Sequence, residues 1–471
     1  MTTSSSSHAV PRPAGRRQFL RNSAVASAVL ALGNGRAAAA RATIAPRLRA
    51  GAAELVATPD AVGSFLIGPL KPSTGIHDEL FLRALVLDDD GGMPAAIVTL
   101  DYLGFDLAYT EKLIAAASEG AGVPPGNVLL NCSHTHSAPL SVPWGPWREH
   151  RNASFFNHLP IRIREVTRLA RERLQPATLR SHQAPVQIGF NRRLLHGDRI
   201  TMATNPAGVV VPWTDVLAID GTDGQPIAVV FAYAAHPVII HATSTLISAE
   251  YPGFAIERLK ELPGPKPVFL FAQGFAGNIN GFPLRGGIDA ARAAGRELGD
   301  AVLRALELPP RARFTGKLAV RSMDLELPLQ TPPTPAAVET MIATEKSNER
   351  RGHLERLLGV ARRGRAAPMP CPIRALALGH EICVVGVAHE PFAEYHHRLL
   401  AASPYAHTFG LGYTNGMQAY LPTAKDLRLG DRAGYEASTR GAAFTYESSL
   451  PVVPESEAMI HAGFDRLLKD R

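Results

Sequence analysis

Segments with the periodicity of strands and of helices alternate along most of this 471-residue chain. β-rich apolar runs occupy 80–87, 95–100, 127–131, 216–219, 227–234, 268–272, 318–329 and 373–387. Apolar residues recur at helical spacing over 109–117, 155–174, 253–262, 288–306, 391–400 and 455–468. Because a chain that mixes both element types buries its apolar faces in layers, we expect layered mixed β-sheets flanked by helices, in a single large α/β domain.

The first forty residues have the organisation of an export signal. Arg16 and Arg17 form a twin-arginine pair, a short apolar run covers 24–32, and four alanines at 37–40 provide a cleavage site. The apolar run is too short to cross a bilayer. We therefore expect residues 1–40 to direct twin-arginine export to the periplasm or the medium, and residues 41–471 to form the functional domain.

The charge of the chain depends strongly on that segment. Residues 1–40 contain five arginines and no acid, so without them the formal net charge falls from +7 to +2. No basic stripe interleaved with aromatic residues remains, and we expect no nucleic-acid partner. The three cysteines are too few for a disulfide framework, and no later apolar run reaches membrane-spanning length.

A Pro- and Thr-rich linker at 331–335 opens a charged, helix-like insertion, which we place at 331–370. It contains no motif with evident site chemistry. Two interpretations stay open, a surface arm or lid over the domain and a solvated surface helix.

Two histidines follow the short apolar strand predicted at 127–131. If the extended conformation continues, His134 and His136 point to the same face, because side chains alternate along a strand. Two such imidazoles can hold one metal ion, or one can bind metal while the other transfers protons. The alternative is a pair of polar histidines at the end of a strand.

Other candidate residues also follow strands. His236 precedes Pro237, which ends a strand, so it is either a site residue or a buried core histidine. Glu390 lies at a strand-to-helix turn, where a carboxylate can bind metal or stabilise the helix N-terminus. Tyr420 and Tyr435 flank a polar loop and are packing residues unless they converge on a metal.

Several short motifs follow one another in a definite order. They are Gly75-Ile76-His77 with 82–87, Ser133-His134-Thr135-His136-Ser137, Asn191-Arg192, Ala235-His236-Pro237, Phe271-Ala272-Gln273 with Gly277, Glu390-Pro391-Phe392 and Tyr435-Glu436-Ala437-Ser438-Thr439. From about residue 54 onward, this ordered set resembles the catalytic domain of the neutral or alkaline non-lysosomal ceramidases, without the C-terminal β-sandwich domain of that family.

The resemblance implies a site for one zinc ion. By correspondence with the motifs, the ligands of Zn²⁺ would be His134, His236, Glu390 and Tyr420. The residues around the scissile bond would be His136, Arg192 and Tyr435. Where the family has Gly-Asp-Val-Ser, this chain has asparagine in place of serine at 280, which favours a zinc-bound hydroxide as nucleophile.

The implied activity is zinc-dependent hydrolysis of a linear amide in a small-molecule or lipid N-acyl substrate, with transient contact to a membrane surface. Apolar residues that follow the HTHS segment would line the acyl side of the cleft or anchor a loop, namely Leu140, Val142, Trp144 and Trp147. The alternatives are an exported non-catalytic metal-binding protein and a zinc esterase. A serine hydrolase is disfavoured because the chain has no GxSxG motif.

Overall fold

A computed structural model of the protein describes residues 48–59, 63–89, 91–144 and 151–469. The chain divides into units 1–44 and 45–471, and all the described residues belong to the second unit. The predicted export segment at 1–40 and Trp147 lie outside the described residues. Within the described ranges, no helix has the length and apolar character needed to cross a membrane.

The larger of two main sheets has nine strands. Its main path runs in the order β14 (Val268–Gln273), β12 (Pro226–Tyr233), β11 (Trp213–Gly221), β8 (Gln175–Pro185), β1 (Arg49–Val56), β5 (Phe81–Asp88), β6 (Ala95–Leu100) and β7 (Val128–Cys132), with β16 (Ala312–Arg313) beside β8. The β6–β7 and β12–β14 pairs are parallel, and the other pairs are antiparallel. The sheet is therefore mixed, as predicted.

The smaller main sheet consists of β17 (Leu318–Leu327), β18 (Met369–Leu378), β19 (Ile382–Val387) and β21 (His407–Leu411). The prediction of one strand over 373–387 is wrong, because a turn at Gly379 separates β18 from β19. Gly379 has a φ of +71°, and a Cβ there would lie 2.0 Å from the carbonyl oxygen of Thr315. Only glycine combines this conformation with such a close approach.

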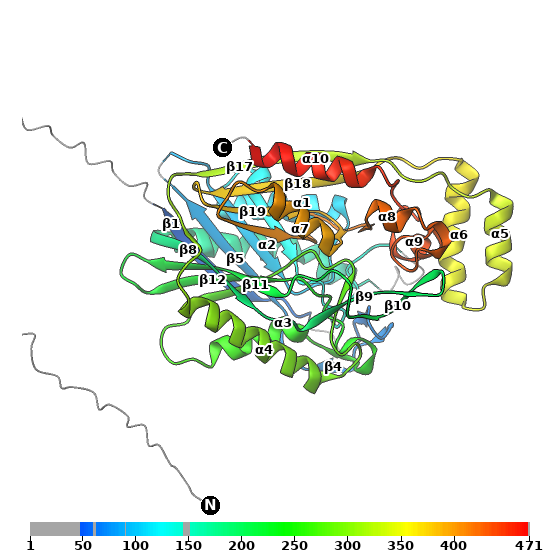
Figure 1. Ribbon diagram of the computed structural model, residues 1–471. Helices are drawn as coiled ribbons and strands as arrows, with labels where there is room; N and C mark the ends of the chain where they lie inside the picture. The colour runs from blue at the N-terminus through cyan, green and yellow to red at the C-terminus, as the bar shows by residue number, and fades with distance from the viewer. Residues whose placement is uncertain (1–47, 60–62, 90, 145–150, 470–471) are drawn as a thin grey trace, which may run out of the picture. The chain divides into compact units, whose positions relative to one another are not determined.

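The strands of both sheets alternate their side chains between two packed faces. On β5, Leu82 and Val86 pack toward α1 (Leu107–Ala121) and α2 (Ala153–Glu172). Leu85 and Leu87 of the same strand face the smaller sheet. The outer face of the smaller sheet is covered by α7 (Ala393–Ala402) and α10 (Ser456–Lys469). Helices, sheet, sheet and helices thus stack in layers (Figure 1), which confirms the predicted fold class.

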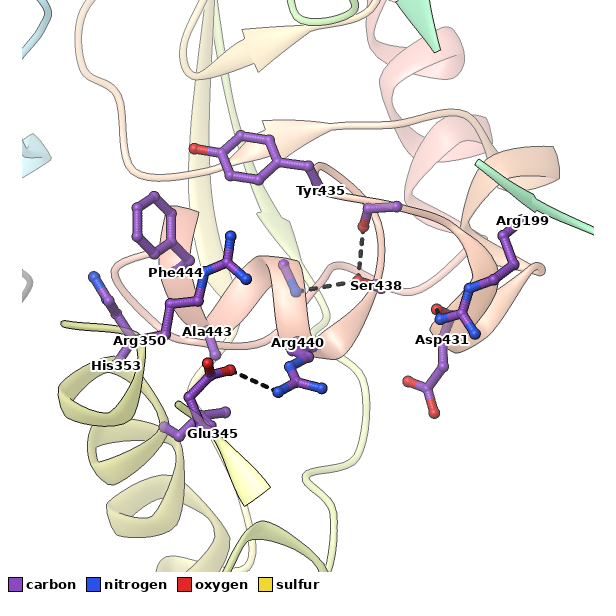
Figure 2. A pocket seen from close by; sticks show the side chains of 13 residues that line it. Arg199, Glu345, Arg350, His353, Asp431, Tyr435, Ser438, Arg440, Ala443 and Phe444 are labelled. Atoms are coloured by element: carbon purple, nitrogen blue, oxygen red, sulfur yellow. Dashed lines mark hydrogen bonds and ion pairs between the residues drawn. The ribbon is translucent and has the colours of Figure 1, made fainter. Parts of the chain in front are cut away.

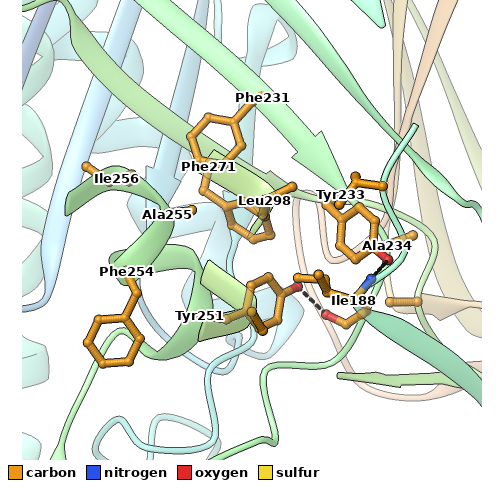
Figure 3. Close-up of a cluster of buried hydrophobic side chains, with 14 of the residues drawn as sticks. Ile188, Phe231, Tyr233, Ala234, Tyr251, Phe254, Ala255, Ile256, Phe271 and Leu298 are labelled. Atoms are coloured by element: carbon orange, nitrogen blue, oxygen red, sulfur yellow. Dashed lines mark hydrogen bonds between the residues drawn. The ribbon is translucent and has the colours of Figure 1, made fainter. Parts of the chain in front are cut away.

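The rest of the larger sheet is covered by α3 (Glu250–Lys260) and α4 (Ile288–Glu307). Figure 3 shows the aromatic rings of Phe231 and Phe271 in the cluster between the sheet and these helices. Each ring is at most 1 % exposed, and burial of such a side chain contributes about 1.5–3 kcal/mol. Two tyrosines of the cluster keep their hydroxyls satisfied, with Tyr251 donating to the carbonyl of Ala235 at 2.6 Å.

The two main sheets are joined where their parallel strands end. The side-chain amide of Asn131, at the end of β7, donates to the carbonyl oxygens of Gln273 at 3.2 Å and Gly412 at 2.7 Å. Gln273 ends β14 in the larger sheet, and Gly412 follows β21 in the smaller one. Loops from both sheets therefore meet at one edge, and this edge carries the candidate site.

Two helices, α5 (Pro335–Thr344) and α6 (Asn348–Arg363), form an arm within the predicted insertion. Thr334 and Ser347 cap their N-termini, each accepting a hydrogen bond from a backbone amide two or three residues into the helix. The arm packs through a small apolar cluster against the segment around α9 (Thr439–Thr445), as Figure 1 also shows.

The remaining elements are short or lie outside the main sheets. They are β2 (Phe65–Leu66), β3 (Lys71–Pro72), β4 (Gly75–Ile76), β9 (Gly189–His196), β10 (Arg199–Asn205), β13 (Leu246–Ile247), β15 (Ile279–Gly281), β20 (Glu390–Pro391), β22 (Tyr420–Leu421) and α8 (Ala424–Leu427).

Candidate metal centre

Three predicted ligands follow strands of both main sheets and meet at the edge joined by Asn131. His134 follows β7, His236 follows β12, and Glu390 forms the short strand β20 after β19. The prediction that the backbone stays extended through His134 and His136 is wrong, because β7 ends at Cys132 and His134 has a left-handed φ of +66°. The resulting turn still brings the two imidazole rings together, with centroids 5.1 Å apart.

Backbone carbonyls fix the orientation of two of these imidazoles. Nδ1 of His134 lies 2.6 Å from the carbonyl oxygen of Leu103. Nδ1 of His236 lies 2.9 Å from the carbonyl oxygen of Ala276 and 3.0 Å from that of Ile279. Since carbonyl oxygens only accept, each Nδ1 carries the proton, and each Nε2 presents a lone pair to the site.

The carboxylate of Glu390 faces both lone pairs. Its Oε2 atom lies 3.4 Å from Nε2 of His134 and 3.0 Å from Nε2 of His236. Burial lowers the pKa of His134 to about 3 and that of His236 well below its usual value, so both rings are neutral. Burial also raises the pKa of Glu390. Three acceptor atoms in a water-poor site repel one another, and a cation between them would relieve this repulsion.

The spacing of these acceptors suits zinc. Tetrahedral ligands at about 2.0–2.1 Å from zinc lie roughly 3.3 Å from one another, close to the two separations from Glu390. The hydroxyl of Tyr420 is 3.5 Å from Nε2 of His236. Glu390 and Tyr420 face each other in register in the parallel β20–β22 pair. This pairing explains how residues far apart in sequence reach one site.

The alternative role of Glu390 at a helix N-terminus does not agree with its position. Helix α7 begins at Ala393, and its N-cap is Phe392. The Glu390 carboxylate instead accepts a hydrogen bond from the hydroxyl of Tyr413 at 3.2 Å. Gly277 lies against the Glu390 backbone, where a Cβ would be only 2.3 Å from the carbonyl oxygen of Glu390. Glu390 is thus held beside the imidazoles of His134 and His236.

His136 is a third imidazole within reach of a metal ion. The ligand atoms of His134, His136 and His236 all lie within 4.8 Å of one another. Nε2 of His136 is buried and has no hydrogen-bond partner among the described residues. Its ring stacks on His241 with centroids 5.3 Å apart, and burial lowers its pKa well below the usual value. His136 is therefore a neutral imidazole with a free ring nitrogen, suited to binding metal or to moving a proton.

Arg192 and Tyr435 lie beside the predicted ligands. Arg192 donates from Nε to Glu436 at 2.8 Å and from Nη1 to Asn280 at 2.9 Å, while its buried Nη2 has no hydrogen-bond partner among the described residues. The rings of Tyr420 and Tyr435 meet edge to face, with centroids 6.0 Å apart. Burial raises the pKa of Tyr435, so its hydroxyl stays protonated and can donate.

These residues line a cavity of about 540 Å³. Val142 and Trp144 are in its wall, as the sequence predicted, together with Leu103 and Met417. Leu140 is instead part of the hydrophobic core. Sequence reasoning missed the cationic lining residues Arg285 and Arg350, and Tyr413 beside Glu390; no motif marks these positions.

Solved structures with a similar fold support the resemblance found in the motifs. The neutral ceramidase from Pseudomonas aeruginosa superposes with a TM-score of 0.66 at 20 % sequence identity, over 90 % of this chain and 74 % of that one. A ceramidase complexed with C2 gives a TM-score of 0.68 at 19 % identity, over 90 % of this chain and 75 % of that one. The chain has the neutral ceramidase fold.

This agreement confirms the resemblance at the level of the fold. No protein-family model matches the chain, and no curated protein matches it by sequence. The similarity to ceramidases is therefore evident from the arrangement of the helices and strands and from the order of the short motifs.

Proposed function

We propose that this protein is a zinc-dependent hydrolase that cleaves the linear amide bond of N-acyl compounds. The proposal depends chiefly on one observation, the convergence of His134 Nε2, His236 Nε2 and Glu390 Oε2 beside the cavity. Buried acceptors without a proton between them are typical of a metal site. The ceramidase fold of the chain agrees with hydrolysis of such amides.

We assign the metal ligands to His134, His236, Glu390 and Tyr420, the set implied by the family resemblance. When bound there, zinc would act as a Lewis acid and lower the pKa of a bound water from 15.7 to about 7. His136 stays outside this set in our proposal and keeps its free ring nitrogen for proton transfer.

The surrounding side chains support attack of water on an amide carbonyl. The unpartnered Nη2 of Arg192 and the hydroxyl of Tyr435 can donate hydrogen bonds to the carbonyl oxygen as it becomes negative. His136 can carry a proton to the amide nitrogen, which then leaves as an amine. The acyl carbon keeps the oxygen of the water, so the products are a carboxylic acid and an amine.

The apolar wall favours an acyl chain on one side of the scissile bond. Val142 and Trp144 are 3 % and 8 % exposed and line the cavity near the histidines. Each methylene buried against such a wall contributes about 0.8 kcal/mol. We therefore expect kcat/KM to rise as the acyl chain lengthens.

A panel of N-acyl amides and matched esters, assayed with and without a chelator, tests the proposed function. Chelator-sensitive cleavage of the amides is the expected result. Turnover of esters alone would make the protein a zinc esterase. Tight metal binding without turnover of any substrate would favour a non-catalytic metal-binding protein.

We also propose export through the twin-arginine route, from the pair Arg16 and Arg17. Replacement of both residues by lysine should leave the precursor in the cytoplasm, as measured by cell fractionation. An unchanged exported yield would contradict this proposal.

A further inference from the structure

A second cavity, of about 300 Å³, lies between the arm and the segment around α9. Arg350, Tyr435 and Phe444 line both this arm cavity and the metal-side cavity. Arg350 comes from α6 of the arm, and Phe444 comes from α9. Figure 2 shows the Arg350 side chain extending between the ring of Phe444 and that of Tyr435. Arg350 therefore lies at the junction of the two cavities.

Two acidic side chains near this junction, Glu345 and Glu436, already have hydrogen-bonded partners. Glu345 accepts from Arg440 at 2.6 Å and from the backbone amide of Ser347 at 3.1 Å. On the metal side, Glu436 is paired with Arg192 at 2.8 Å. In contrast, the Arg350 guanidinium forms no hydrogen bond or ion pair within the described ranges. The Arg350 guanidinium attracts the nearby Glu345 carboxylate electrostatically, but its N–H groups stay free to donate to a ligand in either cavity.

The two cavities differ in the groups that they offer to a substrate. Val142 and Trp144 line only the metal-side cavity. The arm cavity has charged side chains such as Arg199 and Arg440 beside apolar ones such as Leu354 and Phe444. An amide bond at the metal centre would place its acyl chain along the apolar wall and its amine fragment past Tyr435 toward the arm.

We propose that Arg350 binds a carboxylate on the amine fragment, so that the preferred substrates are N-acyl amino acids. This inference rests on the proposed amide hydrolysis. A guanidinium presents paired donors that match a carboxylate, and such charge-assisted hydrogen bonds are stronger than neutral ones. A neutral hydroxyl or amide in the same place would make weaker contacts with Arg350. The arm then acts as a specificity element, because it carries this arginine to the substrate.

A matched pair of substrates isolates the charge. N-lauroylglycine and N-lauroylglycinamide have nearly the same shape and differ in whether the terminal group is anionic. The wild-type holoenzyme should favour the acid by about tenfold or more in kcat/KM, as expected for hydrogen bonds to a charged group. Arg350→Gln should remove this preference, so that the ratio of kcat/KM for the acid to kcat/KM for the glycinamide falls to about one.

Arg362→Gln is the matched control on the same helix. Arg362 is exposed and pairs with Glu339 of the arm at 3.2 Å, so the preference for the acid should persist in this variant. Metal content should be the same in all three proteins. Retention of the preference in Arg350→Gln, or its loss in Arg362→Gln, would overturn the role of Arg350.

Equilibrium titration of the same holoenzymes with both compounds separates this proposal from the proposed function. If the wild type binds the acid more tightly and Arg350→Gln does not, the carboxylate site stands even when neither compound is cleaved, and only the hydrolytic function fails. Equal binding of acid and amide by the wild type would overturn the carboxylate site, whatever the rates of hydrolysis.

Discussion

The two adjoining cavities, one beside the candidate metal centre (the metal end) and one beside the arm (the arm end), are built in different ways. At the metal end, His134, His236 and Glu390 are at most 6 % exposed and are held by contacts from both main sheets. At the arm end, Arg350 is exposed and extends from a helix pair with a small apolar cluster of its own. One end is fixed by the core of the fold, and the other is attached to its surface.

This difference suggests that the two ends have separate roles, one in the chemical step and the other in selection among substrates. Groups that act on every substrate need geometry held by rigid elements, which the strand ends provide. A group that selects among substrates can lie on a peripheral element without disturbing the chemistry. Changes to the groups that act on the amide bond should therefore affect all substrates equally, whereas changes at the arm end should affect only the ratio between charged and neutral substrates.

The largest effect that tests this separation of roles is expected from His136→Ala. Loss of a general acid or base lowers kcat by about 10²–10⁴-fold, and both members of the glycine pair should be affected alike. The metal should remain bound, because His134, His236 and Glu390 are unchanged. Steady-state kinetics and elemental analysis on the same preparation check this. Loss of zinc would instead make His136 a ligand, as the spacing of the three imidazoles permits.

Stability should also differ between the two ends. Glu436 is 2 % exposed and pairs with Arg192 and Arg193. Glu436→Ala leaves the buried Arg192 without its ion-pair partner, while Arg193 keeps Asp426 at 2.9 Å, and the change should cost about 3–5 kcal/mol in the free energy of unfolding. Glu339→Ala removes an exposed partner from the arm and should cost about 0–1 kcal/mol. Urea denaturation measures both, and similar losses would show that burial does not distinguish the two ends.

The apolar wall at the metal end should control the dependence on acyl length. In the wild type, each added methylene that packs against the wall should raise kcat/KM by about fourfold, which corresponds to 0.8 kcal/mol. Trp144→Ala should reduce this increment while leaving the preference for N-lauroylglycine over its amide intact. Kinetics over a series of N-acylglycines provides the measurement. An unchanged increment would exclude Trp144 from the acyl site.

A small and local effect is expected from weakening the arm itself. Ser347 caps α6 by accepting from the backbone amide of Arg350 at 3.2 Å. Ser347→Ala should destabilise this helix by about 1 kcal/mol, seen as faster amide hydrogen exchange within 348–363. Exchange in β7 should not change. Equal acceleration in both elements would mean that the arm and the core open together.

Sequence periodicity predicted most of the strongly apolar strands, but it missed the polar β10 and also the buried β1 and β21. Strands β5 and β6 were evident because nearly all their residues are apolar and buried. Strand β10 was missed because most of its residues are exposed, and its pairing with β9 holds it in place. The hairpin of β18 and β19 was taken as one strand because apolar residues continue on both sides of Gly379.

The candidate site was predictable only where a motif marks it. His134, His236 and Glu390 follow apolar strands, and the structure brings them together as the family resemblance implied. Tyr413 donates a hydrogen bond to Glu390 at 3.2 Å. No local sequence pattern predicts this contact, because it depends on how the two sheets join. Arg350 was missed for a similar reason, since its place at the cavity follows from the docking of the arm.

The metal content of purified protein tests the central claim most directly. After metal-replete expression, elemental analysis should find about one zinc per chain, as a single four-ligand site implies. His236→Ala should lose this metal, whereas Arg362→Gln should keep it. A wild-type protein without zinc, or a His236→Ala protein that retains a full equivalent, would contradict the assignment of this centre.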